Sequence, residues 1–112
     1  MIHLIREKAT SQQITEMLDA LGTYIKLTVD IRRKVLVGGG ILHSDCEAEL
    51  LNDGSRQQDI WGADWLPKPQ KVRFEALINI RPRQNNTTME IQNPTIRAEV
   101  ESIIRELLGE AN

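Results

Sequence analysis

The sequence predicts a two-layer α+β domain, in which a mostly antiparallel sheet of four or five strands carries two helices on one face. Three observations lead to this class. Apolar and polar residues alternate along 25–31 and 71–81, which is the period of half-buried strands. Apolar residues recur at helical spacing near 10–22 and 94–108. Turn-forming residues separate these segments, so helices and antiparallel strands are expected to share one core.

Length and composition limit the class of protein further. The 112 residues suit one domain spanning 1–112, and the net charge of -2 comes from mixed charges without a basic field. We therefore expect no nucleic-acid partner. The single Cys46 excludes an intrachain disulfide. No apolar run approaches the roughly 20 residues that span a bilayer, and the start does not resemble a signal peptide, so we expect a soluble, cytoplasmic protein without a membrane partner.

The first third of the chain alternates between strand and helix patterns. Residues 2–5 suit a short strand. Thr10 followed by Gln13 is a capping box, which opens a helix, and Gly22 is a suitable helix end.

Residues 25–37 predict a hairpin. Ile31 opposite Val35 would leave the three-residue loop 32–34. After it, the apolar parity switches at the three glycines 38–40, which favours a bulge or strand break. A phosphate-binding loop would need a following helix and a Lys-Ser/Thr pair, and the pattern indicates neither.

Residues 42–61 predict a second hairpin, turning at Asn52-Asp53-Gly54. Its register sets Cys46 opposite Ile60 on the core side, where a thiol is inert and cannot form a dyad with His43. On the other side it sets Glu47 opposite Asp59.

The strand 71–81 is expected to pair with the strand that contains Ile60. This register places Asp59 beside Asn79 and Trp61 beside Leu77. Asn93-Pro94 then starts the last helix, which Gly109 ends.

The face of the sheet opposite the helices collects ionisable side chains, either as plain solvated surface or as a site. Glu47 opposite Asp59 would be destabilising unless a cation intervenes. Apolar area on the same face is typical of contact surfaces. The candidate residues for binding a ligand or partner are Trp61, Arg73, Glu75, Asn79 and Arg81.

Two chemistries are open for the carboxylates on this face. Glu47 and Asp59 as close neighbours would share a proton, and with His43 beside them they are candidate catalytic residues. The alternative is a structural network with Arg81 and Asn79. Asp45, Glu47 and Asp59 are also candidate metal ligands. His43 and Glu47, four apart on a strand, are roughly 13 Å apart and cannot reach one ion, so at best His43 with Asp45, or Asp45 or Glu47 with Asp59, would share a metal. We expect no cofactor, with a divalent metal ion as the alternative.

The segments 38–47 (GGGILHSDCE), 59–63 (DIWGA) and 78–82 (INIRP) together resemble small uncharacterised bacterial proteins, chiefly cyanobacterial, grouped as a domain of unknown function. The resemblance covers nearly the whole chain. It implies a small cytosolic protein and brings no reaction, cofactor or partner with it.

Two hypotheses for function remain. The first is an interaction or self-association module, a homo-oligomer or the binder of another protein, with Trp61 and Leu77 as apolar anchors. The second is a small enzyme or ligand-binding protein with a carboxylate, His and Arg site for an anionic small molecule. The sequence alone leaves the function unknown.

Overall fold

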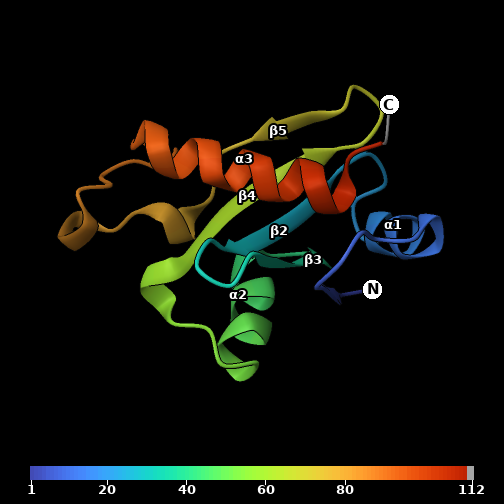
Figure 1. Ribbon diagram of the computed structural model, residues 1–112, viewed down its shortest axis with the longest axis horizontal. Coiled ribbons are helices and arrows are strands. Elements are labelled where there is room, and N and C mark those ends of the chain that lie inside the picture. The colour runs from blue at the N-terminus through green and yellow to red at the C-terminus, as the bar shows by residue number, and fades with distance from the viewer. Residues whose placement is uncertain (111–112) are drawn as a thin grey trace.

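The computed structural model describes residues 1–110, and its centre is one antiparallel sheet of five strands (Figure 1). The spatial order is β1-β3-β2-β4-β5. The α+β class and the antiparallel sheet are thereby confirmed. The strands are β1 (His3–Ile5), β2 (Ile25–Asp30), β3 (Val35–Gly40), β4 (Ile60–Leu66) and β5 (Lys71–Arg73).

Three α-helices accompany the sheet: α1 (Ser11–Leu18), α2 (His43–Asn52) and α3 (Pro94–Leu108). The two predicted helices, α1 and α3, pack against the same core, as expected. Their capping is also confirmed, because Thr10 and Gln13 form the capping box and Asn93 accepts hydrogen bonds from the first turn of α3. In residues 1–110, no helix combines the length and the apolar character needed to cross a bilayer.

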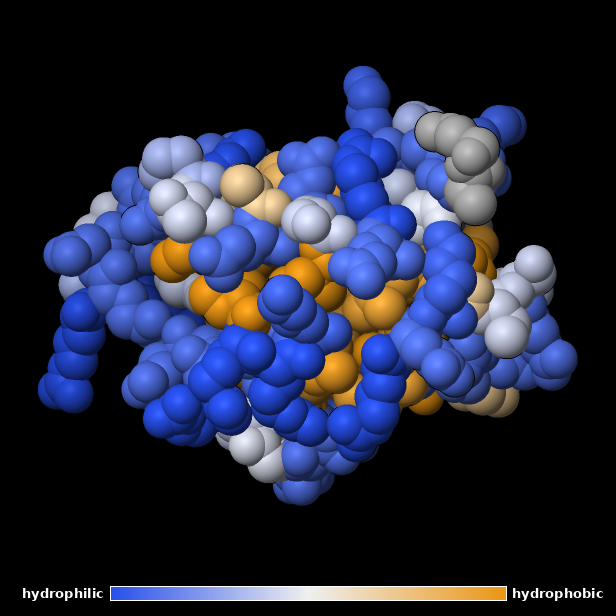
Figure 2. All heavy atoms as spheres, viewed as in Figure 1, coloured by the Kyte–Doolittle hydropathy of each residue, from blue (hydrophilic) through white to orange (hydrophobic). Residues whose placement is uncertain are grey.

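The larger core lies between the sheet and the pair α1 and α3. In Figure 1, α3 crosses in front of β2 and β4. Figure 2 shows this face from outside: hydrophilic side chains cover most of it, and apolar side chains are visible in a band along the middle. The largest fully buried side chains here are Trp61 and Trp65 of β4.

The other face of the sheet is covered by α2, where a strand was predicted, and that prediction is wrong. Cys46 and Leu50 pack with Val35, Val37 and Ile60 in a second core. Their spacing of four residues is even, so it fits one face of a strand as well as one face of a helix. The segment His43–Asn52 contains no β-branched residue, which favours the helix.

This covering overturns the predicted polar face of the sheet. Thr28 and Asp30, expected to face solvent, are fully buried. The second hairpin, with its pairing of Cys46 to Ile60, does not form, because Ile60 pairs with Asp30 of β2. A helix does follow the three glycines, contrary to expectation, although no Lys-Ser/Thr pair accompanies it.

The predicted strand 71–81 is also mostly wrong, because the chain pairs with β4 only as far as Arg73. It then leaves the sheet and forms a short 3-10 helix, Leu77–Asn79. Asn79, expected to point outward, is fully buried and bonds through its side chain to both backbone groups of Gly62. One side-chain amide therefore continues the sheet where the backbone has departed.

The first hairpin differs from its prediction by one position. Asp30, not Ile31, pairs with Val35, so the loop has four residues. The Asp30 carboxylate accepts hydrogen bonds from the backbone N–H groups of Arg32 and Arg33, which orders the loop. The predicted bulge is confirmed, since the register shifts opposite Gly39, whose φ is +102°.

Candidate functional site

Three charged residues form a row across neighbouring strands on the α2 face of the sheet. Asp64 of β4 pairs with Lys26 of β2 on one side and with Arg73 of β5 on the other. The Asp64 side chain is 9% exposed, and its Oδ2 lies 3.3 Å from Arg73 Nε. A carboxylate so deeply buried requires partners of opposite charge or hydrogen-bond donors.

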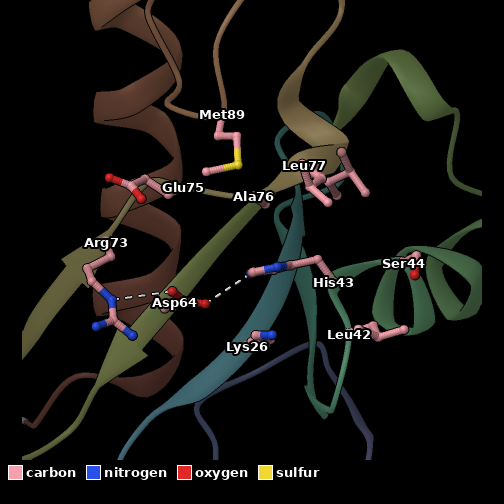
Figure 3. A pocket seen from close by; sticks show the side chains of 11 residues that line it. Lys26, Leu42, His43, Ser44, Asp64, Arg73, Glu75, Ala76, Leu77 and Met89 are labelled. Atoms are coloured by element: carbon pink, nitrogen blue, oxygen red, sulfur yellow. Dashed lines mark hydrogen bonds and ion pairs between the residues drawn. The ribbon is translucent and has the colours of Figure 1, made fainter.

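His43, the first residue of α2, supplies a second partner for Asp64. Its Nε2 lies 2.9 Å from Asp64 Oδ1 and 3.0 Å from the carbonyl oxygen of Ala63. Figure 3 shows the imidazole reaching from the start of the helix to the carboxylate, with Arg73 on the opposite side. Asp64 thus fixes the orientation of the His43 ring, as a carboxylate does in many proton-transfer sites.

Two contacts hold the start of α2 against the sheet and so position His43. Lys26 Nζ donates to the carbonyl oxygen of Ile41, at 3.0 Å. Cys46 Sγ lies 3.6 Å from the carbonyl oxygen of Lys26 and is buried. Burial raises the pKa of the Cys46 thiol to about 11, so this side chain packs as a small apolar group, as the sequence predicted.

Lys26, His43, Asp64 and Arg73 form the floor of a cavity of about 480 Å³ between α2, the sheet and the segment that follows β5 (Figure 3). Its size is within the range of small-molecule sites. Apolar side chains surround the polar floor, and Leu42 and Leu77 are more than half exposed. The cavity is lined by Lys26, Leu42, His43, Ser44, Asp64, Arg73, Glu75, Ala76, Leu77, Ile78 and Met89.

Among the charged residues of the cavity, Lys26 is the one most available to an anion. Asp64 is already shared by His43 and Arg73, whereas Lys26 bonds only to a neutral carbonyl within residues 1–110. Figure 3 shows the Glu75 carboxylate turned away from His43. The N-terminus of α2 has no side-chain cap and adds partial positive charge.

Of the predicted site residues, His43, Arg73 and Glu75 line this cavity. Glu47 and Asp59, expected as neighbours, are each paired with arginine. Glu47 Oε2 lies 3.5 Å from Arg81 Nη2, and Asp59 Oδ2 lies 3.1 Å from Arg32 Nε.

Arg81 is part of the fold rather than of an open site. Its Nε donates to the carbonyl oxygen of Ile78, its Nη1 donates to that of Gln57, and its guanidinium lies over the Trp61 ring. Burial lowers the pKa of Arg81, while Glu47 opposes that shift. The structural network that the sequence left open for Glu47 and Arg81 is therefore present.

The predicted metal ligands are not brought together. Asp45 lies exposed in the first turn of α2, while Asp59 lies in the 3-10 helix Gln57–Asp59 before β4 and is bound by Arg32 and Arg56. Within residues 1–110, no three or more His, Cys, Asp or Glu side chains form a group that can hold a metal ion.

Trp61 and Asn79 were expected on an exposed face, and that expectation is wrong. Trp61 is 1% exposed and packs in the larger core, and Asn79 is fully buried. Leu77 alone of the two predicted apolar anchors is exposed, at 73%.

Sequence reasoning missed Lys26 and Asp64 as site residues. Asp64 stands in the otherwise apolar segment Ile60–Leu66, and a lone charge in a buried strand requires a partner. That pattern would have identified it. Lys26 is its cross-strand neighbour and follows once the pairing of β2 with β4 is known.

The fold and the cavity define a small α+β protein with a charged, apolar-rimmed site on the helix-covered face of an antiparallel sheet. Residues 3–107 match the model of a protein family of unknown function, DUF5674, and the chain belongs to that family. The resemblance to a domain of unknown function is thereby confirmed. No curated protein and no solved structure matched the chain.

Proposed function

We propose that the protein binds a small anionic molecule with an apolar part in the cavity at His43. The observation that carries this proposal is the convergence of His43, Asp64 and Arg73 on the floor of a cavity whose rim is apolar. An open, flat sheet face would have argued against such a site.

The two halves of the cavity suit the two halves of such a ligand. Lys26 and Arg73 are the two cations that line the cavity, and a carboxylate or phosphate there would accept hydrogen bonds from them. Leu42, Leu77 and Met89 would contact an apolar body and remove it from water. A few polar groups in an apolar surround are typical of sites that orient one small molecule.

A thermal-unfolding screen tests this proposal, with benzoate, hexanoate and phenyl phosphate as anionic probes and benzamide as an uncharged match for benzoate. If an anion binds with a dissociation constant of about 1 mM, a concentration of about 10 mM adds about 1.4 kcal/mol. For a domain of this size, that raises the melting temperature by about 5 °C or more. Benzamide is expected to give a smaller shift.

Variants locate the binding. R73Q and K26Q should each reduce the shift by more than half, because each removes a cation from the cavity floor. K68Q is the matched control, since Lys68 is exposed in the turn between β4 and β5. No shift with any anion, or equal shifts in K68Q and R73Q, would refute the proposed site.

A second candidate function is self-association through the rim of the cavity. Leu42 and Leu77, which line the cavity, are exposed by 53% and 73%, and exposed apolar side chains of this kind are typical of contact surfaces. Sedimentation of the wild type and of L77S tests it. A dimer that L77S weakens would favour this function, and a monomer in both would refute it.

We also propose that the protein acts in the bacterial cytoplasm. The mixed surface charge and the single reduced, buried cysteine support a reducing compartment. Fractionation of cells that express a tagged chain tests the location.

A further inference from the structure

The hydrogen bonds of His43 determine which ring nitrogen can gain a proton. Nε2 lies between two oxygens, Asp64 Oδ1 and the carbonyl oxygen of Ala63. Because a carbonyl oxygen only accepts, Nε2 carries a hydrogen in both the neutral and the charged ring. Within residues 1–110, Nδ1 has no hydrogen-bond partner, so it is the ring nitrogen that is left open to a further contact.

The charges that face the ring come from every element around it. Asp64 comes from β4, Lys26 from β2, and Arg73 and Glu75 from β5 and the segment after it. Along α2, Glu47 lies one turn beyond His43 and is paired with Arg81. With a neutral His43, the two cations and two carboxylates that line the cavity balance, so protonation of the ring leaves one positive charge in excess.

We infer that the cavity binds its anionic ligand together with one proton, which Nδ1 of His43 takes up. This inference rests on the proposed function. The proton comes from solvent, and the new Nδ1–H group donates to an anionic oxygen of the ligand. No bond other than N–H is made, and no redox partner is required. The charged ring and the anion stabilise each other, so each binds more strongly when the other is present.

Benzoate binding as a function of pH tests the inference. The chain has two histidines, so the background variant H3Q leaves His43 as the single imidazole. Benzoate stays ionised from about pH 5.5 to 8.5, because carboxylic acids titrate near pH 4. In H3Q, the affinity for benzoate should be highest at the acid end and fall by up to about tenfold per pH unit once histidine is neutral. In H3Q/H43Q, the affinity should not change with pH.

A second readout uses the folded H3Q variant without changing His43. The proton NMR signal of the ring should titrate at a higher pH when benzoate is saturating than when it is absent. Benzoate binding that is independent of pH, with no change in the ring titration, would refute proton uptake while leaving the proposed function intact. No benzoate binding at any pH would refute both.

Discussion

The side-chain amide of Asn79 makes with Gly62 the pair of hydrogen bonds that a neighbouring strand would make. Gly62 N donates to Asn79 Oδ1 at 2.8 Å, and Asn79 Nδ2 donates to the Gly62 carbonyl oxygen at 3.0 Å. The same amide nitrogen lies 3.0 Å from the carbonyl oxygen of Met89. Asn79 therefore ties the segment that walls the cavity to the centre of the sheet.

N79A should destabilise the protein by about 3 kcal/mol, because it leaves buried backbone groups of β4 without partners. Urea unfolding followed by circular dichroism measures this change. N52A is the matched control, since Asn52 is exposed at the end of α2, and it should change stability by no more than about 0.5 kcal/mol. Equal stability of the two variants would contradict the structural role of Asn79.

G62A should also destabilise the protein, by about 2 kcal/mol, for a steric reason. A Cβ at Gly62 would lie 2.5 Å from the Cβ of Ala76, which is too close for two carbon atoms. The double variant G62A/A76G removes the Cβ of Ala76, with which the new Cβ would clash, and should recover at least half of the lost stability. If the double variant is less stable than G62A, the close packing of the two residues is not the cause.

Acid should weaken the contact between Asp53 and two arginines. Hydrogen bonds from Arg33 and Arg6 hold the pKa of the Asp53 carboxyl below its usual 3.8. The stabilisation is therefore complete above about pH 4 and is lost as the pH falls through the lowered pKa of the folded state. The difference in unfolding free energy between the wild type and D53N should be constant from about pH 7 to pH 5 and shrink at about pH 3.

D19N is the control for that comparison, because Asp19 is an exposed carboxylate after α1. D19N removes the same charge from a residue that, within residues 1–110, has no paired arginine, so its unfolding free energy should stay close to that of the wild type at every pH. If the difference in unfolding free energy between the wild type and D53N grows as the pH falls, the lowered pKa of Asp53 is contradicted.

Cys46 should be unreactive in the folded protein. Burial raises the pKa of its thiol to about 11, so at about pH 8 only about one thiol in a thousand is ionised. Labelling with a disulfide reagent should be slow in buffer and complete within minutes in urea. Fast labelling without urea would show that α2 opens from the sheet, since this side chain lies beneath the helix.

The parts of the fold that local sequence determines were predictable. The caps formed by Thr10 and Asn93 act on backbone groups within three residues, so the starts of α1 and α3 follow from short patterns, whereas α1 ends at Leu18, before the expected Gly22. The sequence pattern does not distinguish a helix from a strand in the segment of α2, because Cys46 and Leu50 are four residues apart, a spacing that fits one face of either element.

The candidate site depended on contacts between distant segments. His43 was identified from its residue type, but its partner Asp64 lies 21 positions away and becomes a neighbour only when α2 forms. Alternation predicts Asn79 as an outward residue of a strand, whereas its observed role depends on Gly62 of β4, 17 positions away. Periodicity assigns a face to a residue and does not reveal such partners.

Amide NMR spectra recorded during a benzoate titration test the central claim most directly. The account predicts saturable shifts that are largest at Ser44, Asp64 and Arg73, which line the cavity, and an affinity at least about fivefold weaker in R73Q than in K68Q. An absence of saturable shifts, or shifts confined to the outer face of α3, would contradict it.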